Sequence, residues 1–599
     1  MRKRALSIAL ISILMTITVV FVVPNVAVAN SFFWQGTDVS DSGSQGLLDY
    51  DKQREVHDAL LDALPVQLYP EGPYAKSGVG YLASLDGLPN PNGGIQNGLV
   101  RMPGGVLSGT RGVRIPCGPG ECWEGYTFLN SRQEPVSGGN GPLVLIDMDG
   151  TIVNSFGGGG SFGGAGKMLK GGFVISSERG DLVQRDWCSN EVKRFEGLNN
   201  HHDHQREGST DGYYYPGQDA FTDHGKTLSL GSVNVGPDAS VRRVALEEDT
   251  TGIVNVKRFD PQRPHRPLND DVIREITWDY DCQSALSSTC DDIIFEWHAR
   301  DYFVPTATNL GFGLYEDEAA QYALDLGLNS GGGGNSWRND PQRSSMEDWS
   351  HGNSVAWLGN NRWYTKDKDE RFHPDNIIAD FRSLNTTVII ARYDNPGKWN
   401  SGDIVWRLGP HYGTDGPDGK VGQIIGQHMA YMIPDTVPGG GNIMIFDNGG
   451  GAGYGALIEG LTDPDTGEKL GFWPNKFRNF SRVLEINPIT RQIVWQYVQA
   501  KPTPTSGDML GNNHLFYSSI MSGAQRLPNG NTLITEADSG RIFEVNMDRD
   551  VVWEYAPDFL SSDPGLFDGI YRAYRVPYSW IPKNALKDMD DNGVYDMCE

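Results

Sequence analysis

The sequence has few cysteines and few basic residues for its length, and each shortage excludes a class of protein. Only six cysteines occur in 599 residues, so the chain is not a disulfide-dense scaffold, and no spacing between them demands a metal. Lysine and arginine total 50 against 76 aspartates and glutamates, which gives a formal net charge of −26. Such an acidic surface argues against nucleic acid and anionic lipid as partners.

Long apolar runs are lacking after the first 29 residues. Residues 1–29 combine a basic Arg2-Lys-Arg4, an apolar run from Ala5 to Val23 and a small-residue site at Ala27-Val-Ala29, which together predict a cleaved signal peptide. An uncleaved anchor is the alternative, because the run is long enough to span a bilayer. We therefore expect a periplasmic or secreted protein that has no membrane segment after cleavage.

The cysteine spacing leaves the disulfide pairing open, because connectivity cannot be deduced from sequence alone. Grouped by spacing, the cysteines are Cys117 with Cys122, Cys282 with Cys290, and Cys188 and Cys598 as the remainder.

Short strands in one repeating format dominate the chain from about residue 140. Each unit has an apolar strand, a turn with Asp or Asn, and a strand that ends in Val or Ile beside an aromatic residue. The six units begin at Leu143, Trp187, Asp291, Val388, Arg482 and Ile542. Hairpins that repeat with a tryptophan at a fixed place are typical of β-propeller blades.

These units predict an all-β fold, a six-bladed β-propeller with long inserted loops over residues 136–580. The spacing exceeds the about 40–50 residues of a bare blade, which indicates insertions, notably at 207–250, 305–348 and 359–376. A β-sandwich is the alternative, but six similar units fit it poorly. Residues 30–135 do not show the pattern clearly and are expected to form an N-terminal cap or small domain.

Three histidines occupy an equivalent place at the head of a repeated strand. His428 begins the strand before the turn Gly439-Gly-Gly-Asn442, and His351 and His202 take the same place in two other repeats, with Ser522 there in a fourth. Because the inner strands of a propeller line one channel, these imidazoles are expected to converge. A single histidine in a strand is usually a structural or surface residue. Three histidines at the same position of a repeated strand instead favour a functional site.

Two polar residues accompany the histidines. Asn353 follows His351 by two positions, so both side chains point to the same side of an extended strand. Arg382 precedes the next strand and would supply the positive charge that an anionic substrate needs, with a surface arginine as the alternative.

Taken together, these segments resemble the bacterial arylsulfate sulfotransferase family, which transfers sulfuryl groups without a nucleotide cofactor. The matching stretches are Asn200-His-His-Asp203 with Tyr213-Tyr-Tyr-Pro-Gly217, Trp349-Ser-His-Gly-Asn-Ser354, Phe381-Arg-Ser383, Gly426-Gln-His428 with Ile445-Phe-Asp-Asn-Gly449, and residues 522–535. The resemblance covers most of residues 140–580. It implies a periplasmic six-bladed propeller, aryl sulfates and phenols as small-molecule partners, and no cofactor required for catalysis.

The resemblance also implies roles for single residues. His428 matches the nucleophile and would carry the sulfuryl group as a sulfohistidine in a two-step, ping-pong transfer. The remaining expected positions are His351, His202 and Arg382 for catalysis, and Asn353 and His201 for substrate binding. Either His202 or His351 could act as acid and base, since an imidazole titrates near neutral pH.

Two other function classes fit the same residues. Converging imidazoles are also a zinc or copper arrangement, although Arg382 would repel a cation. A non-catalytic propeller that binds a glycan or a protein would leave each histidine dispensable. The sequence leaves the oligomeric state open.

The acidic tail at 581–599 contains the calcium-loop pattern D-x-[DN]-x-[DN]-G-x₅-E. The oxygen ligands expected of this loop are Asp588, Asp590, Asn592, Val594, Asp596 and Glu599. A frayed tail without calcium is the alternative.

Overall fold

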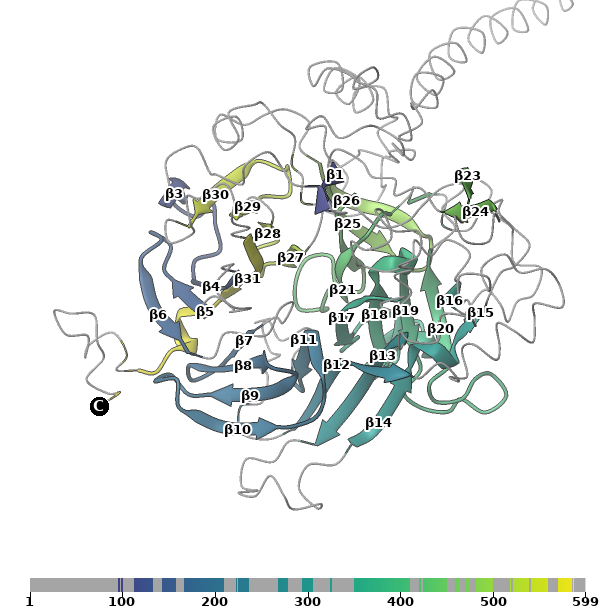
Figure 1. Cartoon of the computed structure of the whole chain (residues 1–599). Coiled ribbons are helices and arrows are strands. Elements are labelled where there is room, and N and C mark those ends of the chain that lie inside the picture. Colours follow the sequence, from purple (N-terminus) through teal and green to yellow (C-terminus); the bar gives the residue numbers. More distant parts are fainter. Residues whose placement is uncertain are drawn as a thin grey trace, which may run out of the picture.

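The computed structural model describes the chain in segments. The described residues are 95–96, 99–100, 112–132, 143–157, 166–208, 222, 225–235, 268–277, 293–304, 324–325, 350–409, 418, 420–421, 424–449, 458–462, 469–472, 481–498, 516, 518, 521–537, 540–557, 569–583, 585 and 598. Six antiparallel sheets of four or five strands stand in a ring around a common centre (Figure 1). The predicted six-bladed β-propeller is therefore confirmed.

Each blade is one sheet, and four of the six begin with their innermost strand and run outward along the chain (Figure 1). Blade 1 contains β7 (Lys167–Leu169), β8 (Phe173–Glu178), β9 (Asp181–Arg185) and β10 (Glu191–Phe195). Blade 2 contains β11 (Asn200–Arg206), β12 (Lys226–Val235), β13 (Leu268–Thr277) and β14 (Ile293–His298). Blade 3 contains β17 (Gly352–Trp357), β18 (Ile377–Phe381), β19 (Thr386–Ile390) and β20 (Ile404–Leu408).

The second half of the ring follows the same plan. Blade 4 contains β21 (His428–Met432), β22 (Ile443–Asp447), β25 (Arg482–Asn487) and β26 (Gln492–Tyr497). Blade 5 contains β27 (Gly523–Arg526), β28 (Thr532–Glu536), β29 (Arg541–Val545), β30 (Val551–Ala556) and β3 (Gly112–Ile115). Blade 6 contains β31 (Gly569–Val576), β4 (Tyr126–Arg132), β5 (Leu143–Ile146) and β6 (Ile152–Phe156).

Short elements complete the described chain. The remaining strands are β1 (Ile95–Gln96), β2 (Leu99–Val100), β15 (Phe303–Val304), β16 (Leu324–Asp325), β23 (Ile458–Thr462) and β24 (Lys469–Phe472). The helical turns are η3 (Ala299–Asp301), α4 (Arg362–Thr365), η6 (Glu370–Phe372), η7 (Arg382–Leu384) and η8 (Tyr578–Trp580). In the described segments, no helix is long and apolar enough to cross a membrane.

Strands from both ends of the chain close the ring. β31 pairs with β4 in blade 6, and β3 pairs with β30 as an added fifth strand of blade 5. Both β3 and β4 fall in residues 30–135, which were expected to form a separate cap, so the propeller begins before residue 136. Local patterning did not reveal these strands because their partners lie more than 400 residues away in sequence.

The repeated tryptophans join neighbouring blades. Each stands on the fourth strand of its blade, and its indole Nε1 donates a hydrogen bond to a backbone carbonyl in the next blade. The pairs are Trp297 with Gly402 at 3.0 Å, Trp406 with Pro488 at 2.9 Å, Trp495 with Met547 at 3.1 Å, and Trp553 with Met148 at 3.0 Å. A buried indole needs a partner for its N–H, so the repeat fixes how adjacent blades pack.

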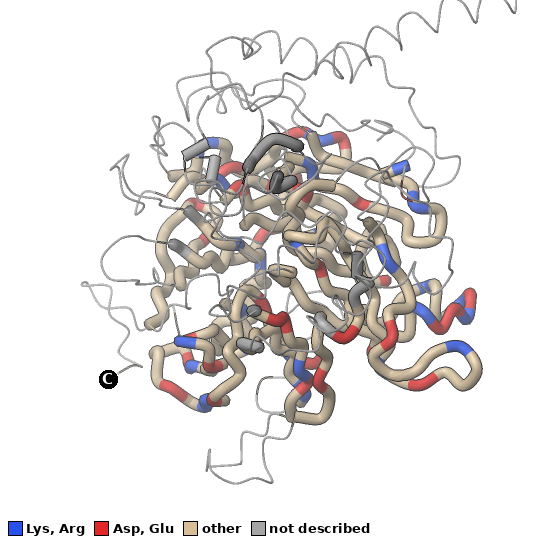
Figure 2. The backbone as a smooth tube through the Cα atoms, turned by 45° about the vertical axis from the view of Figure 1, so that its right-hand side comes forward, with Lys and Arg blue, Asp and Glu red and all other residues tan. Residues whose placement is uncertain are grey.

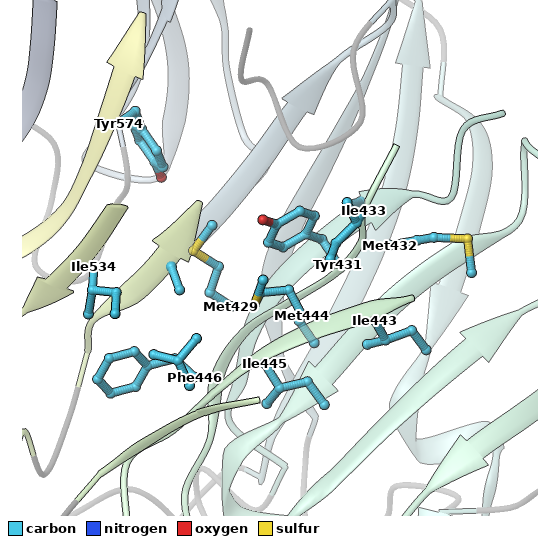
Figure 3. Close-up of a cluster of buried hydrophobic side chains, with 14 of the residues drawn as sticks. Met429, Tyr431, Met432, Ile433, Ile443, Met444, Ile445, Phe446, Ile534 and Tyr574 are labelled. Carbon is cyan, nitrogen blue, oxygen red and sulfur yellow. The ribbon is translucent and has the colours of Figure 1, made fainter. Parts of the chain in front are cut away.

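The core lies between the blades, and the strands of blade 4 illustrate why. All residues of β21 and β22 are buried, because each blade is covered on both faces and its strands are therefore apolar on both sides. Figure 3 shows side chains of β21 and β22, among them Met429 and Phe446, packed with Ile534 of β28. Burial of one such side chain stabilises the fold by about 1.5–3 kcal/mol.

Two disulfide bonds lie in the described segments. Cys117 pairs with Cys122, and Cys188 pairs with Cys598, which joins the C-terminal segment to the turn between β9 and β10. The expected loop between Cys282 and Cys290 lies outside the described residues, as do all six expected calcium ligands from Asp588 to Glu599.

Candidate active site at the centre of the propeller

Four histidines approach one another at the centre of the ring. The ring centroid of His202 lies 4.8 Å from that of His351 and 4.9 Å from that of His201. His428 on β21 is close enough that its charge would influence His202. Blades 2, 3 and 4 thus each bring a sequence-predicted histidine to one place.

The backbone at these strand heads is left-handed. His202, His351 and Ser522 have φ values of 60°, 49° and 82°, a conformation that is uncommon for residues other than glycine and costs of order 1–3 kcal/mol. In β21 the left-handed residue is Met429 rather than His428. His428 therefore stands one residue before the left-handed position that His202, His351 and Ser522 occupy. The strand pairing is irregular at the heads of β11, β17 and β21 alike.

Asn448 determines the tautomer of His428. The Asn448 side-chain amide nitrogen donates to the backbone carbonyls of Ser518 at 2.9 Å and Met521 at 3.0 Å, so its oxygen faces Nδ1 of His428 at 2.7 Å. Nδ1 also lies 3.1 Å from the carbonyl of Gly426. Since both neighbours are acceptors, Nδ1 carries the proton. Nε2 then holds the lone pair and accepts from the backbone N–H of Met521 at 3.1 Å.

The surroundings keep His428 and His202 uncharged. Burial lowers the pKa of His428 well below its usual value, and the positive charges of Arg382 and Arg572 lower it further. Burial is also the largest cause of the lowered pKa of His202, followed by the neighbouring His351 and His201. Both imidazoles are therefore neutral at physiological pH and able to act as bases or nucleophiles.

Arg382 is held beside this cluster by its backbone. It begins η7 at the corner between β18 and β19, and its N–H donates to the carbonyl of His351 at 3.0 Å. The left-handed Asn385 ends η7, and its side-chain oxygen accepts from the N–H of Gly426 at 2.8 Å. The corner that carries Arg382 is thereby tied to both His351 and the strand of His428.

Asn353 lies between blades 3 and 4. Its side chain is fully buried, and its amide nitrogen donates to the carbonyl of Gln427 at 3.2 Å. Gln427 directly precedes His428, so this bond sets the spacing of the two strand heads. The structure places Asn353 in the central cluster with the predicted residues.

Arg572 is a residue of the site that the sequence did not indicate. It stands on β31, is fully buried, donates from Nη2 to the carbonyl of Asn353 at 2.7 Å, and lies 3.3 Å from Asp203. Asp203 also contacts Lys167 at 2.8 Å. The strand sequence, in which Arg572 and Arg575 interrupt an otherwise apolar run, is the signal that could have identified a buried arginine here.

The charge at the centre differs from the charge of the whole chain. Acidic and basic residues are interspersed over the described tube (Figure 2), and the total is strongly negative. At the centre, the buried Arg382 and Arg572 both oppose a positive charge on His428, and of these two Arg572 also lies 3.3 Å from the carboxylate of Asp203. Such an arrangement attracts an anion. In the part of the chain that the structure describes, no group of three or more His, Cys, Asp or Glu residues could hold a metal ion.

Comparisons with solved structures give weak likenesses. The chain is similar to a protein of unknown function from Bacteroides caccae at 8% identity and a TM-score of 0.34, covering 75% of this chain and 98% of that chain. It is also similar to apo AztD from Citrobacter koseri at 8% identity and a TM-score of 0.29, covering 75% of this chain and 98% of that chain. TM-scores this low carry no argument. No curated protein matches the sequence.

A family model gives the informative match. Residues 271–552 match the model described as Arylsulfotransferase (ASST). This span includes His351, Asn353, Arg382 and His428, whereas His202 and its neighbours in β11 lie before it and Arg572 lies after it. This match to the central part of the chain supports the resemblance to the arylsulfate sulfotransferase family.

Proposed function

We propose that this protein transfers a sulfuryl group from an aryl sulfate to a phenol through a sulfohistidine on His428, without a nucleotide. The observation that carries this proposal is the fixed tautomer of His428, whose Nε2 lone pair stands beside two buried arginines. The family supplies the reaction class, and the electrostatics of the centre support an anionic substrate.

The first half-reaction forms the covalent intermediate. Nε2 of His428 attacks the sulfur of the aryl sulfate, the N–S bond forms, and the S–O bond to the aryl group breaks. The electron pair of that bond leaves with the phenolate. Covalent catalysis of this kind divides one difficult transfer into two easier steps. The neutral state of His428 leaves Nε2 unprotonated, and attack requires that Nε2 give up its hydrogen bond from the N–H of Met521.

The second half-reaction releases the intermediate. The acceptor phenol loses its proton to a base, its oxygen attacks the sulfur, and the N–S bond breaks to return Nε2 its lone pair. The base then releases this proton to solvent, and the phenolate set free in the first half-reaction takes one up from solvent. The overall exchange therefore consumes no oxidant, metal or nucleotide.

Arg382 and Asn353 would bind the sulfuryl oxygens, with Arg572 supplying further positive charge. Sulfuryl transfer resembles phosphoryl transfer in depending mainly on positioning and charge stabilisation. Preorganised donors matter most where charge redistributes in the transition state, and loss of one costs about 10²–10³ in rate.

The metal-dependent alternative is disfavoured by the same charges. Burial, Arg382 and Arg572 all act to lower the pKa of His428, because each opposes a positive charge on that imidazole. A bound zinc or copper ion would meet the same repulsion.

Mass spectrometry of a digest tests the proposal directly. The protein is incubated with an aryl sulfate in excess chelator, with no nucleotide and no phenol, and is then digested at neutral pH. We expect a mass gain of one sulfuryl group on the peptide that contains His428, and a matching burst of released phenol.

The matched variants are His428→Ala and His373→Ala. His373 packs against Tyr364 and Tyr393 at ring centroid distances of 4.8 Å and 5.5 Å, away from the centre. The first variant should lose the burst and the second should keep it. A full burst from His428→Ala, or activity that disappears in chelator and returns with zinc, would contradict the proposal.

A further inference from the structure

Asp271 contacts both histidine segments at the centre. It stands on β13, is buried, and its Oδ1 lies 3.2 Å from Nε2 of His201. Its Oδ2 accepts from the N–H of Gly352 at 2.7 Å and from the hydroxyl of Ser350. One carboxylate thus faces His201 and holds the two residues that flank His351.

Gly352 allows this approach. A Cβ at this position would lie 3.3 Å from the carboxyl carbon of Asp271 and 3.1 Å from a methyl of Leu230, tighter than most side-chain contacts. The absence of a side chain therefore lets the carboxylate reach the backbone N–H.

His201 connects Asp271 to His202. Nδ1 of His201 lies 2.8 Å from Nδ1 of His202, and the two rings are nearly perpendicular at 89°. The 3.2 Å contact between Nε2 of His201 and Asp271 is an ion-pair distance without hydrogen-bond geometry. A carboxylate offers no proton and favours one on the nitrogen that it approaches, so we assign the proton of His201 to Nε2, which leaves Nδ1 as the acceptor in the neutral ring. The proton between the two rings then belongs to Nδ1 of His202. Nε2 of His202 is left with the lone pair.

We propose that Asp271 and His201 form a proton relay behind His202, and that His202 is the base that deprotonates the acceptor phenol. This inference rests on the proposed function, and it distinguishes His202 from His351, which the sequence left as equal candidates. His202 is the group that touches the substrate, whereas Asp271 and His201 are positioning residues.

The proton balance of the step is complete. The phenol O–H bond breaks as Nε2 of His202 takes the proton and the oxygen attacks sulfur on His428. His202 can pass its Nδ1 proton to Nδ1 of His201, whose positive charge then faces the carboxylate of Asp271. Burial disfavours a positive charge on His202. The carboxylate of Asp271, on the far side of His201, would stabilise that charge once the proton has been taken up.

The test separates the two half-reactions with the purified full-length protein. A chromogenic aryl sulfate measures the first as a burst of phenol. The second is then measured with two acceptors at one pH: a weakly acidic phenol, which is neutral, and a strongly acidic phenol, which is already ionised and needs no base.

His201→Gln is the principal variant, because it interrupts the relay and leaves the contacts of Asp271 with Ser350 and Gly352 in place. We expect an unchanged burst, transfer to the neutral phenol slowed roughly 10²-fold or more, and nearly normal transfer to the ionised phenol. Asp271→Asn should follow the same pattern if it folds, as judged by its thermal melt.

Asp270→Asn is the matched control. Asp270 neighbours Asp271 on β13, but its carboxylate contacts His298 at 2.9 Å, away from the centre. Both acceptors should react normally in this variant.

Two results would overturn the relay. Equal slowing of both acceptors in His201→Gln indicates a structural role, and no slowing of the neutral phenol shows that proton removal does not pass through His202. Absence of a burst in the unmodified protein would instead contradict the sulfohistidine mechanism, so the two failures are distinguishable.

Discussion

The guanidinium of Arg572 on the inner strand of blade 6 donates to the carbonyl of Asn353 on the inner strand of blade 3, at 2.7 Å. The two residues are 219 positions apart, and their blades stand on opposite sides of the ring (Figure 1). A single side chain therefore spans the centre. The candidate site is held together by contacts across the ring as well as between neighbouring blades.

The first prediction concerns the pH profile of Arg572→Met. The charge of Arg572 lowers the pKa of His428, so its removal should raise that pKa toward the usual value. Protonation removes the lone pair that attacks sulfur, and the acid limb of kcat/KM for the aryl sulfate should therefore move to higher pH. The control is Arg575→Met, on the same strand, whose guanidinium lies over Trp553. Equal acid limbs in both variants would contradict the assigned role of Arg572.

The second prediction concerns Asn448. Asn448→Leu removes the acceptor for Nδ1 of His428, so Nδ1–H loses the partner that fixes the tautomer. Hydrogen-bond partners that orient metal-bound imidazoles contribute about 10–100-fold, and we expect an effect of the same order for this imidazole. We expect the burst rate to fall by about that factor, while transfer to a phenol from preformed sulfohistidine changes less. A burst at the normal rate would show that Gly426 alone is sufficient to orient the ring.

The third prediction concerns stability and Asp380. Burial raises the pKa of this carboxyl from 3.8 to about 7, although a hydrogen bond from Ser354 at 2.8 Å partly opposes the rise. The folded protein binds the proton more tightly than the unfolded chain, so this contribution is fully present below about pH 3.8 and is lost as the pH rises through about 7. Asp380→Asn should therefore raise the Tm at pH 8 and change it little at pH 4. A gain that is equal at both pH values would contradict the shift.

The fourth prediction concerns the disulfide between Cys188 and Cys598. The double variant Cys188→Ser, Cys598→Ser frees the C-terminal segment from blade 1 and should lower stability by roughly 2–4 kcal/mol, the usual range for a disulfide. The bond lies at the outer turn of β9 and β10, so sulfuryl transfer should be unchanged below the melting transition. Denaturant unfolding and a transfer assay on the same sample measure both, and a loss of transfer without unfolding would be unexpected.

The fifth prediction concerns the calcium loop, which stays a sequence prediction. Calcium should raise the Tm of the full chain but not that of Asp588→Asn, Asp590→Asn. This double variant is preferable to truncation before the loop, because truncation would also remove Cys598. Equal shifts in the two proteins would exclude the loop as the calcium site.

The fold could be predicted from the sequence because the repeated tryptophans mark the contacts between neighbouring blades. Trp297, Trp406, Trp495 and Trp553 each donate to the next blade, so the repeat in sequence is also the repeat in packing. The two strands β3 and β4 have no such marker. They pair with β30 and β31 near the other end of the chain, and a local sequence pattern cannot predict such distant pairing.

The central cluster was predictable only in part. Strand-head position selected His202, His351 and His428, and the structure brings all three to the centre. His428 stands one residue before the left-handed position of the other strand heads, an offset that strand periodicity does not reveal. Asp271 was not identified because its partner His201 stands on a strand two positions away in the same sheet, and this cross-sheet contact depends on the glycine at 352.

Because β31 closes blade 6, the candidate site is complete only after this late strand has been synthesised. The strands that carry His202, His351 and His428 emerge from the ribosome before β31, which supplies Arg572 and pairs with β4. A nascent chain that has not reached residue 572 therefore lacks both the closing strand and the arginine that spans the ring. Reactivity toward a sulfate ester should therefore appear only in a chain that includes β31, the strand that completes the last blade.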